Sequence, residues 1–212
     1  FGAKLGFIYS TYGSIETVDH IRGLKYFQEF KNNLSDICPP IITKLKSQKP
    51  YTKITFKPDY VRFGMPNGIT SDMCALFKKR AYDISAVSDH SVKKVQVTYN
   101  GEPVPVKNFQ QYIDKYIGAK SDNGFRVYEA PDERWEYAVA LSPTHEFVAV
   151  SFVNGICTSK GGKHVDYIVG QITRKLCAYI EKNKKITVNQ NSIKEQLILF
   201  LRCDIENPSF DS

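Results

Sequence analysis

The sequence predicts an α+β fold built from two-layer α/β sandwiches, and three consecutive segments carry that prediction. Val148, Val150 and Phe152 fall on alternate positions, as they should on one face of a strand spanning residues 147–153. Apolar residues then recur every three or four positions from Val165 to Ile180, which is the period of a helix. A second apolar run, at residues 196–203, has the length of a strand. Strand, helix and strand in this order predict helices on one face of a sheet.

The first 60 residues predict a short helix followed by strands. Apolar residues behind a glycine indicate the helix, and two alternating segments indicate paired strands around a short loop. Prolines bracket a basic loop, and the strand after it ends at Lys57-Pro58-Asp59. The helix, the paired strands, the loop and the last strand span residues 1–9, 14–18 and 25–30, 38–50, and 51–56.

The middle of the chain predicts a capped helix and a hairpin. Thr70-Ser71-Asp72 is a good helix cap, and apolar residues then recur at helical spacing as far as Ile84. Asn100-Gly101 follows the alternating run at 95–99 and indicates a type I′ hairpin.

The remaining elements follow the same periodicities. They are a short helix at 109–116, a polar loop at 120–124, strands at 125–128 and 135–141, and a long helix from about Lys163 to Lys182.

Composition restricts the class of protein. Hydrophobic residues make up 42% and aromatic residues 13%, which is enough for a packed core and too much for a disordered chain. No apolar run reaches the length of a membrane span, so no membrane is expected as a partner. The five cysteines are widely spaced without C-x-x-C pairs, which argues against a structural zinc site and a disulfide scaffold and favours a reducing compartment. The net charge of +7 suits a polyanionic partner without requiring one.

A basic, glycine-split turn joins the strand at 147–153 to the long helix. It contains Lys160, Gly161, Gly162, Lys163 and His164. Such a turn is either a connector or a phosphate site, and its spacing favours the connector. His164 at a helix start is typical of a structural hydrogen-bonding residue. No Ser/His/Asp or Cys/His arrangement surrounds it, and we expect no catalytic residue and no metal site in this chain.

A second basic segment follows the long helix and consists of Lys182, Asn183, Lys184 and Lys185. Lysines at a helix C-terminus offset the negative end of the helix dipole, so a solvated helix end explains them. They are also suited to phosphate contacts, which add salt-sensitive affinity for nucleic acid without sequence specificity.

The residues from Ser151 to Tyr167, SFVNGICTSKGGKHVDY, resemble the transducer segment of eukaryotic-type DNA topoisomerase II, a type IIA enzyme. The resemblance extends in order along nearly the whole chain. Its other matching segments are Phe1-Gly2-Ala3-Lys4-Leu5, Thr55-Phe56-Lys57-Pro58-Asp59, Arg80-Ala81-Tyr82-Asp83-Ile84, Asn100-Gly101 with Pro105-Val106-Lys107, and the run from Ile205 to Ser212.

This resemblance implies a domain organisation. Residues 1–106 correspond to the C-terminal part of a GHKL (Bergerat) ATPase fold, beginning in its ATP lid. Residues 107–212 correspond to a transducer domain with a βαβ crossover, ending before the loop that carries the family's switch lysine. We therefore expect this chain to be a fragment of a larger protein.

The resemblance also assigns roles to residues. Phe1, Gly2, Ala3 and Lys4 match the end of the lid that wraps the phosphates of ATP, and Phe1 replaces the family's tyrosine. Residues 182–185 match a lysine-rich loop that contacts the DNA backbone, although Glu181 stands where relatives are basic. Residues 160–164 belong to the surface that lines the DNA cavity. The family's general base and its magnesium-binding asparagine precede the lid, so we expect no ATP hydrolysis by this chain alone.

The function implied is that of the ATP-operated gate of a homodimeric topoisomerase. With ATP and Mg²⁺, the parent isomerase passes one DNA duplex through a transient double-strand break in another. Its expected location is the nucleus, with organellar or viral use left open. The alternatives are a gyrase B-like ATPase, a mismatch-repair ATPase, and a non-enzymatic basic DNA-binding module.

Overall fold

The computed structural model describes residues 2–46, 48–88, 95–122 and 124–210. The chain divides into two compact units, Phe1–Cys74 and Ala75–Ser212, and each is described by itself below. The sequence prediction of a domain boundary near Lys107 concerns the family's organisation and stays a prediction. Among the described residues, no helix has the length and apolar character needed to cross a membrane.

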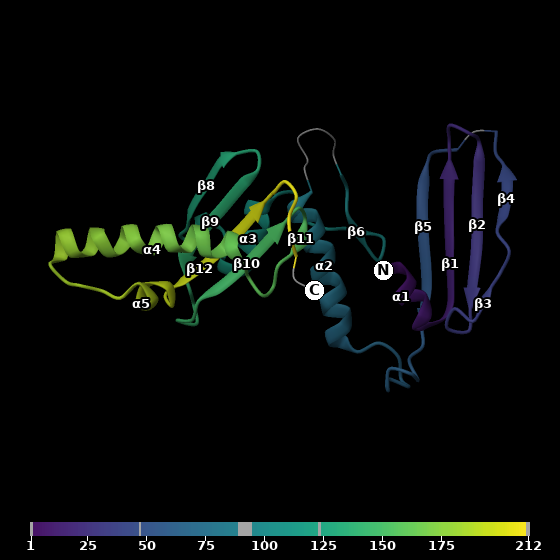
Figure 1. The fold of residues 1–212 in the computed structure, drawn as a ribbon, viewed down its shortest axis with the longest axis horizontal. Coiled ribbons are helices and arrows are strands. Elements are labelled where there is room, and N and C mark those ends of the chain that lie inside the picture. Colours follow the sequence, from purple (N-terminus) through teal and green to yellow (C-terminus); the bar gives the residue numbers. More distant parts are fainter. Residues whose placement is uncertain (1, 47, 89–94, 123, 211–212) are drawn as a thin grey trace. The chain divides into compact units, whose positions relative to one another are not determined.

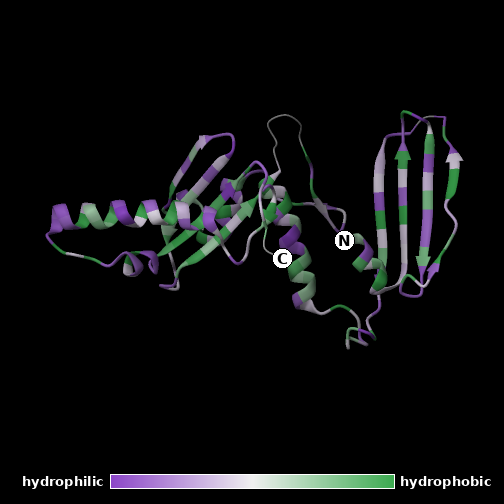
Figure 2. Cartoon of the chain, viewed as in Figure 1, coloured by the Kyte–Doolittle hydropathy of each residue, from purple (hydrophilic) through white to green (hydrophobic). Residues whose placement is uncertain are grey.

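The first unit is an antiparallel sheet with one short helix, α1 (Gly2–Ile8) (Figure 1). The strand order is β3-β2-β1-β5, and β4 also pairs with β2. The strands are β1 (Ser10–Asp19), β2 (Leu24–Lys31), β3 (Asp36–Ile37), β4 (Ile41–Lys44) and β5 (Tyr51–Pro58). Figure 2 shows hydrophobic and hydrophilic residues mixed along the long strands of this sheet.

An aromatic contact helps to pack helix α1 onto the sheet. Phe7 is buried, and its ring stacks on that of Phe30 with 4.7 Å between centroids. A Cβ at Gly13 would lie 2.3 Å from the Phe7 ring, so the absence of a side chain at Gly13 makes the contact possible.

Two strands of this unit, β3 and β4, lie where the sequence predicted none. Strand β4 lies inside the predicted loop at 38–50, so that part of the prediction was wrong. The β-branched residues Ile41, Ile42 and Thr43 pair in register with Phe27, Tyr26 and Lys25 of β2. The flanking prolines therefore bound a short edge strand.

The second unit has a five-stranded mixed sheet in the order β11-β10-β12-β9-β8. Strands β10 and β12 are parallel, with Val148 opposite Ile198, and helix α4 connects them, which confirms the βαβ crossover. The strands are β8 (Val127–Asp132), β9 (Trp135–Leu141), β10 (Val148–Val153), β11 (Ile156–Cys157) and β12 (Leu197–Cys203). The helices are α2 (Ser71–Val87), which begins at the end of the first unit, α3 (Phe109–Ile117), α4 (Lys163–Lys184), α5 (Gln190–Lys194) and the 3₁₀ turn η1 (Lys120–Asp122).

Helices cover both faces of this sheet, whereas the sequence predicted helices on one face only. Ile198 and Phe200 of β12 pack with α2 and α3 residues such as Ala86 and Phe109. Leu199 of β12 packs on the other side in a cluster with α4. The α+β class is confirmed, and the additional layer follows from β12, because a strand that is apolar at consecutive positions has two faces to bury.

Smaller features of the second unit refine the sequence predictions. Asn100 and Gly101 have φ of 52° and 85° between β6 (Thr98–Tyr99) and β7 (Glu102–Pro103), which agrees with the predicted type I′ hairpin. The sequence indicated neither β11 nor α5. Both are short, and α5 is held by packing against α4.

The loop between α3 and β8 closes around a buried arginine. The Arg126 Nη2 atom donates to Asp114 Oδ1 at 2.5 Å, and Nη1 donates to the Gly118 carbonyl at 3.2 Å. Gly124 passes so close to this loop that a Cβ would lie 2.3 Å from the Gly118 oxygen and 2.7 Å from that of Ala119. Backbone atoms cannot move aside as a flexible side chain can.

Two glycine-to-alanine substitutions should therefore have opposite effects. We expect Gly124→Ala to lower the free energy of unfolding by about 1–3 kcal/mol, because it overpacks the loop. Gly170 lies within α4 with open space at its Cβ position, so Gly170→Ala should raise the free energy of unfolding by about 0.5–1 kcal/mol. Urea unfolding followed by circular dichroism measures both changes, and a Gly124→Ala chain as stable as the original would contradict the steric argument.

Candidate functional site

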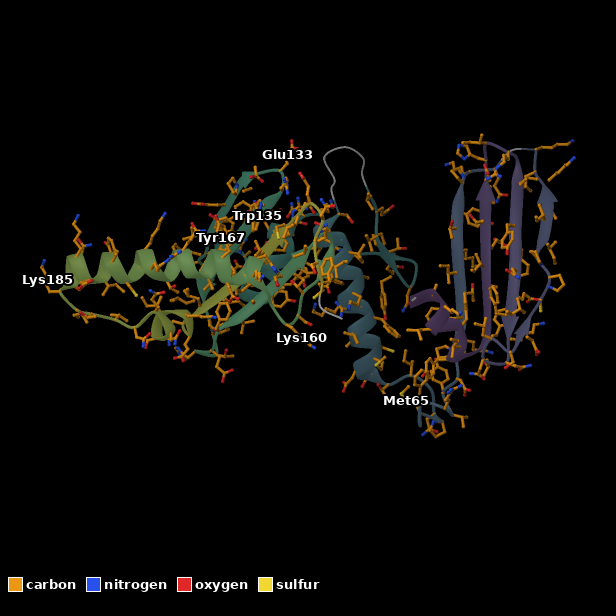
Figure 3. All side chains as sticks on the ribbon, viewed as in Figure 1. Met65, Glu133, Trp135, Lys160, Tyr167 and Lys185 are labelled. Atoms are coloured by element: carbon orange, nitrogen blue, oxygen red, sulfur yellow. The ribbon has the colours of Figure 1, made fainter. Side chains whose placement is uncertain are left out.

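The predicted basic segments lie at the two ends of α4. Figure 3 shows Lys160 near the start of the helix and Lys185 at its far end. The helix has 22 residues, which corresponds to a length of about 33 Å. The two segments are therefore separate surfaces joined by one rigid element.

The glycine-split turn needs both of its glycines. Gly161 has φ of 74°, and Gly162, the N-cap residue of α4, has φ of 141°. Both values lie where a side chain is unfavourable. The Gly162 carbonyl accepts from the backbone N–H groups of Val165 and Asp166 and so starts the helix.

A side-chain network fixes this turn to the sheet. Ser151 Oγ on β10 lies 2.6 Å from Thr158 Oγ1, which in turn lies 3.0 Å from His164 Nε2. The Thr158 backbone N–H also donates to the Ser151 carbonyl at 2.8 Å. His164 is thus a structural hydrogen-bonding residue, as its position at a helix start predicted.

Burial lowers the pKa of His164, because the charged imidazolium loses solvation, and Asp166 offsets this only in part. Lys160 and Lys163 beside it are exposed, and no ion pair is found for either within the described part of the chain. The turn itself is therefore a tightly held connector with free cations on its surface.

The distal segment is fully exposed. The Lys185 N–H donates to the Glu181 carbonyl at 3.0 Å and closes the helix in the left-handed conformation. Asn183 Nδ2 donates to the Tyr179 carbonyl, which leaves Lys182, Lys184 and Lys185 as the chemically free groups of this segment. Ammonium groups presented in this way suit phosphate contacts and read no bases.

The predicted lid residues lie at the start of the first unit. Gly2, Ala3 and Lys4 are exposed in the first turn of α1, while Phe1 lies outside the described residues. The backbone N–H groups of a first helical turn have no partners within the helix and suit an anion. Within the described residues, no His, Cys, Asp and Glu side chains gather as a metal site would require.

The structure adds a buried carboxylate that the sequence patterns did not single out. Asp83 of α2 is 4% exposed and accepts hydrogen bonds from Lys79 Nζ at 2.9 Å and from the Tyr112 hydroxyl of α3 at 2.6 Å. Burial and this bond raise the pKa of Tyr112. Asp83 belongs to the Arg80-to-Ile84 motif. The sequence signal that could have indicated its burial is a carboxylate placed among apolar residues at helical spacing.

A second polar chain ties α2 to the sheet. Arg202 of β12 forms an ion pair with Glu136 at 2.8 Å and donates to the Val87 carbonyl at the end of α2. Tyr128 donates to the same Glu136, and burial together with that bond raises the pKa of Tyr128 to about 12. An arginine at a helix C-terminus also offsets the helix dipole.

The family comparison matches the second half of the chain. The model of the DNA gyrase B family matches residues 107–212. Two curated relatives align over the entire chain: DNA topoisomerase 2 of Saccharomyces cerevisiae is 40% identical over 227 residues, and that of Arabidopsis thaliana is 42% identical over 218. The chain spans 16% and 14% of the length of these two proteins.

Solved structures resemble both units in the same order. The ATPase region of Saccharomyces cerevisiae topoisomerase II has a TM-score of 0.87 and 41% identity, covering 100% of this chain and 52% of that one. The ATP-binding domain of Francisella tularensis topoisomerase IV has a TM-score of 0.62 at 20% identity, covering 97% and 57%. At that identity, the second similarity shows the fold alone.

The Asp83–Tyr112 bond should be an energetically coupled pair. We expect Asp83→Asn to lower the free energy of unfolding by about 1–3 kcal/mol and Tyr112→Phe by about 1 kcal/mol. Lys79 and Arg80 are partly exposed, so most of the cost comes from the buried hydroxyl bond. The double variant should lose less unfolding free energy than the two single variants lose together, by about 0.5 kcal/mol or more. Strict additivity in urea unfolding would contradict the coupling.

His164 should make stability depend on pH. Because its pKa in the folded state lies below the ordinary value of 6.5, the unfolded chain binds the proton more tightly. Stability is therefore complete above pH 6.5 and declines as the pH falls from there through the lowered pKa. His164→Gln should flatten this part of a melting-temperature profile, and an unchanged slope between neutral and mildly acidic pH would refute the assignment.

Proposed function

The chain belongs to the DNA gyrase B family, and we propose that it forms part of the ATP-operated gate of a type II DNA topoisomerase. The observation that carries the proposal is the continuous similarity of both units, in order, to the ATPase region of topoisomerase II. The parent protein would pass one duplex through a transient break in another and so relax, decatenate and unknot DNA. It would act as a homodimer, with the nucleus as its proposed location.

The first unit supplies the end of the ATP lid in this proposal. Gly2, Ala3 and Lys4 offer exposed backbone donors and an ammonium group in the first turn of α1, and Phe1 completes the motif. ATP would supply the triphosphate that these groups bind. No residue described here is assigned to Mg²⁺, which would be held by other parts of the parent protein.

The second unit supplies the transducer. The glycine-split turn and the Ser151–Thr158–His164 network fix the start of α4 to the sheet, so a shift of the sheet is carried to the far end of the helix. Arg202 fixes the end of α2 to the same sheet. A rigid element held in this way can relay nucleotide state to the exposed lysines at 182–185 by rigid-body rotation.

The alternatives have less support. A gyrase B-like enzyme shares the fold. However, the bacterial topoisomerase IV structure is only 20% identical to this chain, whereas the Saccharomyces cerevisiae topoisomerase II structure is 41% identical. A mismatch-repair ATPase would share the GHKL fold without strand passage. A non-enzymatic DNA-binding module would need only the basic surface and would not respond to ATP analogues.

Strand passage by the parent protein tests the proposal. We expect the full-length protein to relax supercoiled DNA and to decatenate linked DNA circles with ATP and magnesium. A full-length protein without this activity would exclude a topoisomerase. We also expect the triple variant Lys182/Lys184/Lys185→Glu to keep the basal ATPase rate and to lose the stimulation by DNA. Lys120→Glu, at an exposed lysine outside the segment, serves as the control. Unchanged stimulation in the triple variant would refute the DNA contact.

A further inference from the structure

Two loops cross at one end of the sheet in the first unit. The β1–β2 turn and the loop between β4 and β5 lie at this end, and α1 lies at the other (Figure 1). The Leu45 N–H donates to the Gly23 carbonyl at 2.8 Å, which ties the loop to the turn. A Cβ at Gly23 would lie 3.0 Å from the Leu45 oxygen, so the absence of a side chain allows this close approach. We call residues 16–25 and 44–53 the loop end of the sheet.

Charge is distributed unevenly between the two ends of this unit. The loop end contains six Lys and Arg residues and two acidic residues. The rest of the unit Phe1–Cys74 contains four of each. The positive charge of the unit is therefore concentrated at the loop end, and such a concentration suits a polyanionic partner.

Both carboxylates of the loop end are already paired within the unit. Asp19 Oδ2 lies 2.5 Å from Arg22 Nε, and Glu16 Oε2 lies 2.8 Å from Lys25 Nζ. Asp19 Oδ1 also accepts from the backbone N–H groups of Ile21 and Arg22 at 3.0 and 3.1 Å, which fixes the turn. Each carboxylate is thus matched by one cation, and the other four lysines carry the excess positive charge.

Three of these four lysines lie on or beside the loop that crosses the turn. Lys44 ends β4, and Lys46 and Lys49 follow in the loop. All three are exposed, and none has a carboxylate within ion-pair distance among the residues that the structure describes. Like charges in one short segment repel one another, and bound phosphates would relieve that repulsion. We call Lys44, Lys46 and Lys49 the loop lysines.

The loop lysines are separate from both sites proposed above. Strand β1 has ten residues, so about 30 Å separate its two ends. Lys4 of the lid lies in α1, beyond the end of β1 that is opposite the loop lysines. The lysines at 182–185 belong to the other unit. The loop lysines therefore suit a polyanion other than the triphosphate proposed for the lid.

We propose that the loop lysines contact the phosphate backbone of a DNA duplex and form a second DNA surface on the first unit. The inference rests on the proposed function, in which a duplex is the polyanion that the parent protein handles. Ammonium groups on a loop contact phosphates and read no bases, so the contact should be sensitive to salt and independent of sequence. An acidic protein segment would use the same charges, and a poly-glutamate peptide distinguishes it from DNA.

Salt-dependent binding of the whole chain to a fluorescein-labelled 20-base-pair duplex tests this inference. The slope of log affinity against log salt concentration changes by about 0.9 for each phosphate contact. We expect Lys44/Lys46/Lys49→Gln to reduce the slope by about 2.7. The affinity lost between 50 and 200 mM salt should then shrink by a factor of about 40.

The matched control is Lys107/Lys115/Lys120→Gln, which removes the same charge at three exposed residues of the second unit. Its slope should equal that of the original chain, and circular dichroism melting confirms that both variants are folded. Acetylation of the original chain gives a readout without any substitution. The duplex should protect the loop lysines from acetic anhydride and leave the three control lysines reactive, as measured by mass spectrometry.

The outcomes separate this inference from the proposed function. An unchanged slope in the loop-lysine variant, or an equal fall in the control, overturns the inference. If Lys182/Lys184/Lys185→Gln lowers the slope and the loop-lysine variant does not, the DNA contact proposed for the second unit stands and only this inference fails. If the loop-lysine variant alone lowers the slope, the inference holds and the contact at 182–185 fails. Poly-glutamate binding that depends on the loop lysines, with duplex binding that does not, identifies an acidic protein segment and overturns the DNA assignment.

Discussion

The second unit depends on one constraint, which is that β12 must be buried on both faces. Ile198 and Phe200 require a layer of α2 and α3, while Leu199 and Leu201 require α4 on the other side. Antiparallel β9 and parallel β10 then complete the pairing on its two edges. The parallel pairing with β10 is what forces a crossover through α4 instead of a tight hairpin. The position of the long helix, and hence of both basic segments, follows from this strand.

Polar groups in this unit fix directions where apolar packing alone would not. Asp83 joins α2 to α3 through Tyr112, and Arg202 joins the end of α2 to β12. Ser151 pairs with Leu201, next to Arg202 in β12, and together with Thr158 and His164 it holds the glycine-split turn. Hydrogen bonds of this kind have strict geometry, so they set the angle at which each helix meets the sheet. The start of α4 is fixed to the sheet in this way, and α5 packs against the helix further along.

Some expectations from the sequence failed for identifiable reasons. Prolines and lysines around Ile41 and Ile42 predict a loop, and only the register with β2 shows that these residues pair as strand β4. Helix α5 has five residues, too few for a periodic signal. The second helical layer was missed because α2 and α3 are distant in sequence from the strands they cover. Asp83 escaped notice because its burial depends on α3, about 30 residues further along the chain.

The sequence by itself determined the family, the order of most elements and the two basic segments, because long motifs and short-range periodicity are written locally along the chain. It also favoured a connector at the Lys-Gly-Gly-Lys turn, and the φ values of Gly161 and Gly162 in the structure show why glycines stand there. Only the tertiary structure decided which faces are buried and which polar groups meet. These depend on contacts between residues far apart in the chain, which no local pattern encodes.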